Sequence, residues 1–382
     1  MGGSAWRIGR VSGIEIAIDQ SWLLIFFLIS MSISAQLAGS HAQAAAAARW
    51  VTALLVACAF FASIVLHELG HSLVAQALGV RVRSITLFLF GGVAQLESEP
   101  RKPAHEIGVA LAGPAVSFAL GGFFYALAGT AGEATLANGG LAWLGRVNLA
   151  LAVFNLAPGF PLDGGRVLRG VLWAATGSFA RATRIAGASG AGIAALLMLA
   201  GVVSLFATHD LVGGLWLVFL GWFLLSASRS AVGAMEVERI LGAVRVAELL
   251  EPVRHAIVSA DANVEALTSA HVLRSGLRTL WVVEPASERL LGIATLRELA
   301  SVAPELRAQT RVGQVMVPVA RATWVAPGET ALVGMQRLVA AGVNQLPVLE
   351  DGRLVGALTR ERLLGLLQAG LMLGKPRGAD AS

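Results

Sequence analysis

The stretch VTALLVACAFFASIVLHELGHSLVAQALGV, residues 51–80, indicates both the fold and the chemistry of this chain. Residues 51–66 are uncharged and mostly apolar, and the apolar character resumes at Leu73. Between them lies the pentapeptide HELGH, residues 67–71. Ionisable groups inside an apolar segment of membrane-spanning length are energetically costly and usually functional. The stretch therefore predicts a membrane helix that carries a chemical site.

The pentapeptide has the H-E-x-x-H pattern of a metal site on a helix. Residues four positions apart lie on one helix face, so the imidazoles of His67 and His71 can reach the same metal ion. Glu68 lies beside that face, where it can act as a base towards the attacking water. The alternative is a structural pair of buried histidines with a glutamate that reaches water, which the apolar surroundings disfavour.

Composition divides the chain into two regions with different solvents. Of the 382 residues, 56% are hydrophobic and 14% are charged, whereas an ordinary soluble domain has about 25% charged residues. Residues 1–235 contain only nine acids, and the remainder resembles soluble protein. The net charge of +5 comes from basic residues between apolar segments, which indicates membrane topology and no nucleic-acid partner. Cys58 is the single cysteine, which excludes an internal disulfide and a cysteine metal cluster.

Six apolar runs have the roughly 20 residues that a membrane span requires. They cover residues 21–38, 51–80, 107–130, 141–162, 185–207 and 211–228. Lys and Arg are absent from the alternate loops 39–48, 131–140 and 208–210, so we expect both termini to be cytosolic in a multi-pass protein of the cell membrane. Arg49 and Arg146 count against this scheme but are outnumbered. The alternative, six buried helices of a soluble core, does not explain the alternation.

Short strands are expected on the cytosolic side of the membrane. Residues 6–18, within the N-terminal segment 1–20, partly alternate between apolar and polar side chains. Residues 84–96 are apolar but interrupted by Gly91–Gly92, which favours a β-hairpin whose turn is the glycine pair. Such a hairpin must have its edges paired or covered.

The third metal ligand is expected from the fourth apolar run. A catalytic zinc needs three protein ligands and one position for water. None of the remaining histidines lies in a membrane segment on the right side: His41, His105, His209, His255 and His271. Asp163 is the only acid at the run 141–162, where Pro158 and Pro161 should end the helix. The second and fourth runs cross in the same direction, and His67 and Asp163 fall about 25 Å or more along them, at comparable depth. Asp163 could also cap a helix, and the two roles do not exclude each other.

HELGH together with FNLAPGFPLDGGR, residues 154–166, resembles the site-2 protease family of membrane zinc proteases. Residues 90–94, FGGVA, resemble the glycine hairpin of that family, and Ala112-Gly113-Pro114 resembles its short turn motif. The resemblance implies one Zn²⁺ per chain, bound by His67, His71 and Asp163, with Glu68 as the base.

The same resemblance extends to substrate contacts. It implies that Asn155 holds the substrate carbonyl or the oxyanion, although a hydrogen bond that packs two helices is the alternative for Asn155. The hairpin at Gly91 and Gly92 would add a substrate strand at its edge. The implied substrates are single-span membrane proteins such as anti-sigma factors or membrane-bound transcription-factor precursors.

An internal repeat fills residues 244–370. VAELLEP at 246–252 matches VGQVMVP at 312–318, and LLGIATLREL at 290–299 matches LVGALTRERL at 354–363. Each half is expected to fold as helix, strand, strand, helix. The halves resemble CBS modules, at 244–302 and 311–370, with a tail at 371–382. The resemblance implies regulation of the membrane domain and a homodimer formed through these modules.

Such modules often bind the ribose of an adenine nucleotide through an acid three residues after a threonine. The corresponding pairs here are Thr295 with Glu298 and Thr359 with Arg362. Arginine cannot accept a hydrogen bond from a hydroxyl group. At most one site is therefore expected to bind a nucleotide, and a purely structural dimer module is the alternative.

The expected fold is a polytopic α-helical membrane protein, residues 21–235, with about six transmembrane helices and a small β-hairpin, followed by a cytosolic α/β CBS pair. The expected function is intramembrane metalloendopeptidase, modulated by the CBS modules. A CBS-regulated transporter or channel is the alternative, but it would not need a hydrolytic base beside a zinc triad. An inactive scaffold of the same family is disfavoured because the triad and Glu68 are intact.

Overall fold

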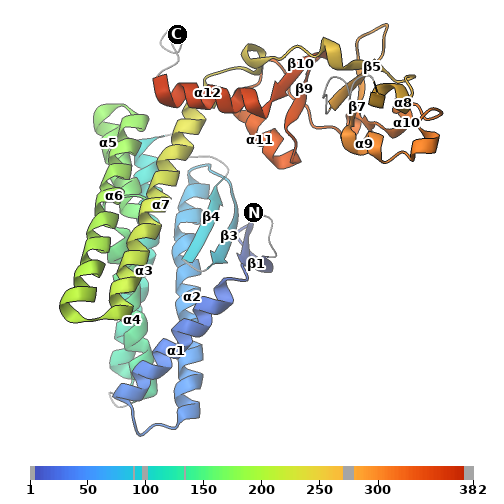
Figure 1. The fold of residues 1–382 in the computed structure, drawn as a ribbon. Helices are drawn as coiled ribbons and strands as arrows, with labels where there is room; N and C mark the ends of the chain where they lie inside the picture. The colour runs from blue at the N-terminus through green and yellow to red at the C-terminus, as the bar shows by residue number, and fades with distance from the viewer. Residues whose placement is uncertain (1–4, 89–90, 97–101, 133–134, 270–278, 374–382) are drawn as a thin grey trace. The chain divides into compact units, whose positions relative to one another are not determined.

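The computed structural model describes residues 5–88, 91–96, 102–132, 135–269 and 279–373. The chain divides into two compact units, Met1–Val232 and Gly233–Ser382. The first is a bundle of long helices with a small sheet, and the second is built from short strands and helices (Figure 1). This composition confirms the predicted class, a helical membrane region joined to an α/β region.

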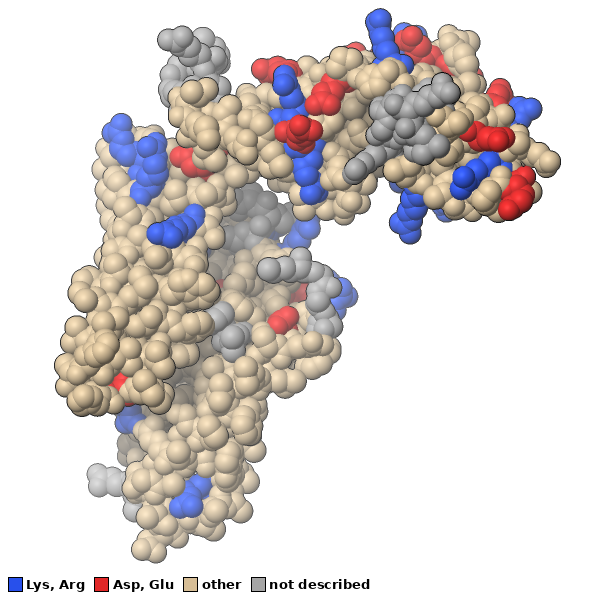
Figure 2. Space-filling view, viewed as in Figure 1, with Lys and Arg blue, Asp and Glu red and all other residues tan. Residues whose placement is uncertain are grey.

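The first unit contains seven helices among the described residues. They are α1 (Trp22–Ser40), α2 (Ala46–Ala77), α3 (Pro103–Thr130), α4 (Leu136–Asn155), α5 (Asp163–Thr176), α6 (Phe179–Val203) with a π-helical end at Ser204–Thr208, and α7 (Leu211–Gly242), which continues into the second unit. Five of them, α1, α2, α3, α6 with its π-helical end, and α7, are long and apolar enough to cross a membrane. Many of their large apolar side chains are exposed, as a surface in contact with lipid requires. Figure 2 shows this region as a surface with few charged side chains.

The fourth predicted run differs in its details. Its helix α4 has 20 residues and is not among the five membrane-spanning candidates. The helix ends at Asn155, and residues 156–162 form a turn before α5 begins at Asp163. Pro158 and Pro161 lie in this turn, so the predicted break is confirmed.

The strands of the first unit form one four-stranded sheet in the order β1-β2-β3-β4. Their bounds are Trp6–Val11, Ile14–Ile18, Val82–Phe88 and Gly91–Leu96. The hairpins β1–β2 and β3–β4 are antiparallel, and β2 joins β3 in parallel. The predicted strands are therefore present, but the prediction that Gly91–Gly92 forms the turn is wrong. Gly91 pairs with Phe88 and Gly92 with Leu87, so both glycines belong to β4.

The sheet is attached to the helix that carries the metal motif. Ile14 and Ile85 of the sheet are buried with Ala75 of α2 and Val109 of α3. This apolar cluster fixes β3 and β4 against the last turns of α2, so the hairpin lies beside the motif (Figure 1).

The second unit contains the two repeats. The first has β5 (Ile257–Ser259), α8 (Val264–Leu267), β6 (Thr279–Val283), β7 (Leu290–Thr295) and α9 (Leu296–Ala300); the second has α10 (Val312–Val315), β8 (Val317–Pro318), α11 (Ala331–Ala341), β9 (Gln345–Glu350), β10 (Arg353–Thr359) and α12 (Arg360–Leu373). Short 3₁₀ turns at Val246–Leu249, Arg254–Ala256, Pro304–Leu306 and Val319–Arg321 connect them.

The two repeats exchange their opening segments. Val246, which opens the first repeat, is buried in a cluster with Leu338 and Leu358 of the second. Val312, which opens the second, is buried with Leu280 of the first. Backbone hydrogen bonds accompany this exchange, from Val246 to Glu329 and from Val312 to Ala262. The halves therefore form one interlocked body.

Candidate metal centre

The two histidines of the HELGH motif converge on one point inside the first unit. His67 and His71 lie one turn apart on α2 and are 4% and 6% exposed. Their Nε2 atoms are 3.2 Å apart. The predicted sharing of one helix face is thus observed, since both rings present the same nitrogen to the same space.

Asp163 completes the cluster. Its Oδ2 atom lies 3.3 Å from Nε2 of His67 and 3.2 Å from Nε2 of His71. Asp163 is the first residue of α5, and Leu162 occupies the N-cap position, so the alternative of a capping role for Asp163 is wrong.

Two glycines allow the approach of Asp163. Gly164 and Gly165 pack against the backbone of the preceding turn, where an added Cβ would lie 2.2 Å from the carbonyl oxygen of Leu156 and 2.3 Å from the carbonyl carbon of Gly159. A side chain at either position would push the start of α5 away. The sequence Asp163-Gly164-Gly165 therefore places a carboxylate at the end of a turn that only glycine permits.

The three side chains fit a zinc ion. A tetrahedral site with Zn–N and Zn–O bonds of about 2.0–2.1 Å has ligand atoms about 3.3 Å apart, and the three separations here are 3.2, 3.2 and 3.3 Å. Two imidazoles and one carboxylate are also a donor set that catalytic zinc sites use.

Residues of α3 orient both imidazoles. Nδ1 of His71 lies 2.7 Å from the carbonyl oxygen of Val109, which can only accept, so Nδ1 carries the proton and Nε2 presents its lone pair. The amide of Gly113 is 3.4 Å from the same nitrogen, and the much shorter carbonyl contact decides the tautomer. Nδ1 of His67 lies 2.9 Å from the hydroxyl of Ser117. Such partners fix ring orientation in metal sites.

The sequence did not identify these orienting groups. A backbone carbonyl such as that of Val109 carries no side-chain signal, and Ser117 is one serine among many. Gly113 was assigned to a short turn, which is wrong because Ala112-Gly113-Pro114 lies inside α3. Its lack of a side chain serves the site instead, since an added Cβ would lie 2.1 Å from Nε2 of His71.

Glu68 lies between the motif helix and the sheet. Its side chain is half-buried and runs past Gly92, where an added Cβ would lie 2.6 Å from Cγ of Glu68. Gly92 therefore lets β4 approach the predicted base closely. The second glycine, Gly91, has a φ of +127°, a conformation that favours glycine.

Asn155 is the last residue of α4 and is half-buried. A different asparagine has the packing role that was the alternative for Asn155. Asn148 is fully buried and donates to the carbonyl oxygen of Leu144, 2.9 Å away, and to Ser63, 3.4 Å away on α2. This contact joins α4 to α2 one turn before His67.

The predicted nucleotide residues form contacts within the chain. Thr295 and Glu298 form a capping box at the start of α9, in which the carboxylate accepts from the Thr295 amide and hydroxyl. Partial burial opposes ionisation of Glu298, but these hydrogen bonds outweigh it and hold the pKa of its carboxyl below the usual range. In the second repeat, the hydroxyl of Thr359 donates to Glu251, 2.9 Å away in the exchanged opening segment.

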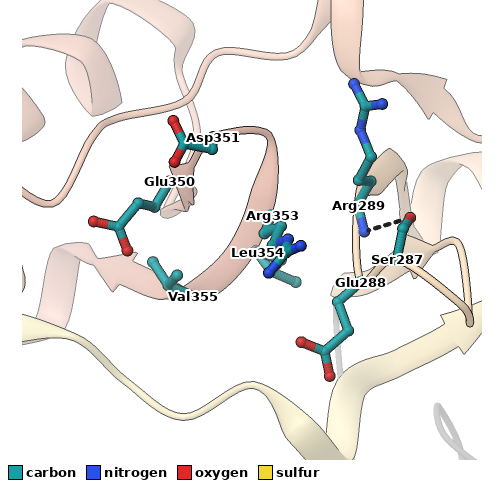
Figure 3. Close-up of a pocket in the computed structure, with 8 residues that line it drawn as sticks. All are labelled: Ser287, Glu288, Arg289, Glu350, Asp351, Arg353, Leu354 and Val355. Carbon is teal, nitrogen blue, oxygen red and sulfur yellow. Dashed lines mark hydrogen bonds between the residues drawn. The ribbon is translucent and has the colours of Figure 1, made fainter.

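A cavity of about 600 Å³ lies between the two hairpin turns of the second unit (Figure 3). Residues 287–289 line it from the β6–β7 turn, and residues 350, 351 and 353–355 line it from the β9–β10 turn. Backbone hydrogen bonds between Leu290 and Gly352 and between Leu354 and Glu288 join these turns. Thr295, Glu298 and Thr359 are not among the lining residues, so the structure does not bring the predicted nucleotide residues to this cavity.

Comparisons with known proteins indicate the family of the chain. The model of Peptidase family M50 matches residues 55–140 and 133–199, and the model of the CBS domain matches residues 312–369. Rip3 of Mycobacterium tuberculosis, which its name describes as a zinc metalloprotease, is 35% identical over 92% of this chain and 90% of its own. The Synechocystis protein sll0528, with the same description, is 34% identical over 95% of each chain. The solved site-2 protease from Methanocaldococcus jannaschii is 28% identical, covers 60% of this chain and 95% of that chain, and has a TM-score of 0.44.

Proposed function

The chain belongs to peptidase family M50, and from that premise we propose that it hydrolyses peptide bonds within or near transmembrane segments of membrane-tethered regulatory proteins. Family membership makes it a zinc metalloendopeptidase with a CBS domain. The observation that carries the proposal is the cluster of His67, His71 and Asp163 beside Glu68, within a bundle of membrane-length helices. The direct test is cleavage of a single-span membrane protein by the purified chain, compared with its Glu68→Gln variant.

The residues of the site divide the chemistry among them. His67, His71 and Asp163 would hold zinc, which supplies an activated water and polarises the scissile carbonyl. Glu68 would accept a proton from the attacking water and deliver it to the leaving amine. Asn155, at the end of α4, would donate a hydrogen bond to the carbonyl oxygen as negative charge develops there.

Strand β4 would hold the substrate. It is an edge strand of the sheet, and Gly92 brings it against Glu68. A transmembrane helix hides its carbonyls in internal hydrogen bonds, so the cleaved segment must unwind, and an edge strand can pair with the extended chain. This arrangement favours proteolysis over the alternative of a transporter or channel, which would need neither a base nor a strand edge at a zinc triad.

The topology of the proposal can be tested by cysteine labelling. The loops 39–48, 131–140 and 208–210 are expected to face away from the cytosol, because they lack Lys and Arg, and both termini are expected to be cytosolic. In a Cys58→Ala background, a cysteine introduced at Thr135 should react with an impermeant reagent only from outside intact cells. Reaction only from the cytosolic side would overturn the topology.

We also propose that the CBS pair, residues 244–302 and 311–370, modulates the protease and forms a homodimer, with one adenine nucleotide per chain at most. Both threonines of the expected ribose sites already donate to carboxylates of the chain. A nucleotide can bind to these threonine hydroxyls only if their hydrogen bonds to Glu298 and Glu251 are broken.

Calorimetry of the full-length chain with ATP, ADP, AMP and S-adenosylmethionine tests the nucleotide proposal. We expect weak binding at one site or no heat of binding. Arg362 cannot accept a hydrogen bond from a ribose hydroxyl, and the hydroxyl of Thr359 already donates to Glu251. Micromolar binding of any of these ligands at two sites per chain would contradict the proposal.

A further inference from the structure

One face of α3 contacts both helices that carry the metal ligands, α2 and α5. Its residues Glu106, Val109, Gly113 and Ser117 are spaced by three, four and four positions, so they lie along one side of the helix. Val109 and Ser117 orient the two histidines, and Gly113 leaves room for them. Glu106 continues this face by one turn, towards α5, the helix that begins with Asp163.

Glu106 forms a buried ion pair with α5. The Glu106 side chain is 0% exposed and Arg169 is 6% exposed. Nε of Arg169 donates to Oε1 of Glu106 over 2.7 Å, and Nη2 donates to the same oxygen. Nε of Arg166 lies 3.9 Å from that oxygen. The position of Arg166 and Arg169 between two apolar runs is typical of a membrane-topology signal, whereas the structure places Arg169 inside the protein.

The guanidinium of Arg169 also joins the segments on both sides of α5. It lies 5.0 Å from the ring centre of Phe160, in the turn before Asp163, and 4.6 Å from that of Phe179, at the start of α6. Cation–π contacts of this kind favour one placement of the guanidinium plane. Arg169 is thus held by α3, by the turn that leads into α5 and by α6.

This contact fixes the position of the third ligand. Arg169 is six residues, or about 9 Å, along the helix from Asp163. Gly170 follows it at a close crossing with α3, where an added Cβ would lie 2.6 Å from Cγ1 of Ile107. Because α5 is a continuous helix of 14 residues, fixing Arg169 fixes both the rotation and the height of Asp163.

We propose that Glu106 and Arg169 are positioning residues for Asp163, so that one face of α3 sets the geometry of all three zinc ligands. The proposal rests on the zinc site of the proposed function. An apolar contact could hold α3 and α5 together without the desolvation cost of a buried ion pair, but it would leave the rotation of α5 free. The planar guanidinium with two donors on one carboxylate oxygen defines that rotation.

The test measures zinc loss, not activity. The full-length chain is loaded with zinc and mixed with a chelator in excess, and the rate of zinc transfer is followed. The variant Glu106→Gln/Arg169→Gln removes both charges of the pair together, so neither of the two is left buried without the other. We expect it to lose zinc about 10- to 100-fold faster than the unchanged chain. Arg169→Lys keeps the charge but loses the planar guanidinium, so its rate of zinc loss should lie between those of the unchanged chain and the double variant. This single variant also provides a test if the double variant does not fold.

A control separates positioning from general loss of stability. Ile33 of α1 is 1% exposed and packs in a cluster with Leu37, Ala53 and Leu144, and none of the three ligands belongs to this cluster. Ile33→Ala should lower the melting temperature and leave the zinc transfer rate within about twofold, since truncating a buried side chain weakens packing without moving the site. Equal acceleration by Ile33→Ala would overturn the proposal.

A second comparison asks whether the effect passes through Asp163. In an Asp163→Asn background, loaded at a free zinc concentration high enough to fill the site, the Glu106/Arg169 double variant should add nothing to the rate. Ser117→Ala, which acts through His67, should still accelerate zinc loss there. Equal effects of the double variant with and without Asp163, or no effect in either, would overturn the inference. If the unchanged chain retained no zinc, the proposed function itself would fail, so the two failures are distinguishable.

Discussion

Glu68→Gln is expected to lower the rate of peptide cleavage by about 10²- to 10⁴-fold while the chain keeps one zinc ion. The amide has the shape of the carboxylate, so its packing against Gly92 is preserved, but it cannot accept the proton of the attacking water. The measurement is cleavage of a purified single-span substrate in lipid vesicles, together with metal analysis of the same preparation.

The matched control is Glu15→Gln. Glu15 lies on β2, in the sheet whose strand β4 packs against Glu68. Its Oε1 atom is 2.6 Å from Nε of Arg7, and its side chain is accessible to solvent. We expect this control to cleave normally. Undiminished cleavage by Glu68→Gln would exclude Glu68 as the base, and loss of zinc from it would mean that Glu68 contributes to the metal site.

Asp163→Ala is expected to abolish cleavage and to lower zinc occupancy together. Removing the carboxylate leaves two ligands among the described residues, His67 and His71, one fewer than a catalytic zinc site uses. Metal analysis after dialysis at fixed free zinc would measure the occupancy, and the same vesicle assay would measure cleavage.

Asp210→Asn provides the control for a general loss of acidic charge. Asp210 accepts from the amide of Gly213 at the start of α7, where it takes no part in the cluster. This variant should keep both zinc and activity. Full metal content with full activity in Asp163→Ala would show that another group is the third ligand.

The metal cluster could be predicted because the sequence shows a helical spacing between the histidines and an order of apolar runs that relates them to Asp163. A four-residue spacing on a helix places His67 and His71 together. The prediction that the second and fourth runs cross in the same direction placed Asp163 at a similar depth, and its carboxylate does lie beside both imidazoles. The orienting face of α3 was not predictable. Val109 acts through a backbone carbonyl, which every residue has, and the partner of Glu106 lies 63 residues away in sequence.

The glycines show the same limit. A glycine pair in an apolar stretch is typical of a turn, but it equally suits a close approach between two elements. Gly92 serves the second purpose, against Glu68, and Gly113 does so against His71. Whether a glycine forms a turn or allows a close approach depends on which helix or strand packs against it. The local sequence does not specify that neighbour.

In the second unit, the internal repeat predicted the paired halves but not their exchange. Glu251 reaches Thr359 across 108 residues because the opening segment of each repeat packs in the core of the other. A repeat pattern defines which residues are equivalent. It does not define which copy they pack against.

We propose that this chain cuts membrane-tethered proteins by means of Glu68 and the cluster of His67, His71 and Asp163. The most direct measurement compares membrane fractions of cells that carry the native chain or Glu68→Gln, by mass spectrometry of newly formed protein termini. We expect new termini within or near single transmembrane segments that are present with the native chain and absent with the variant. Identical sets of termini in the two samples would contradict it.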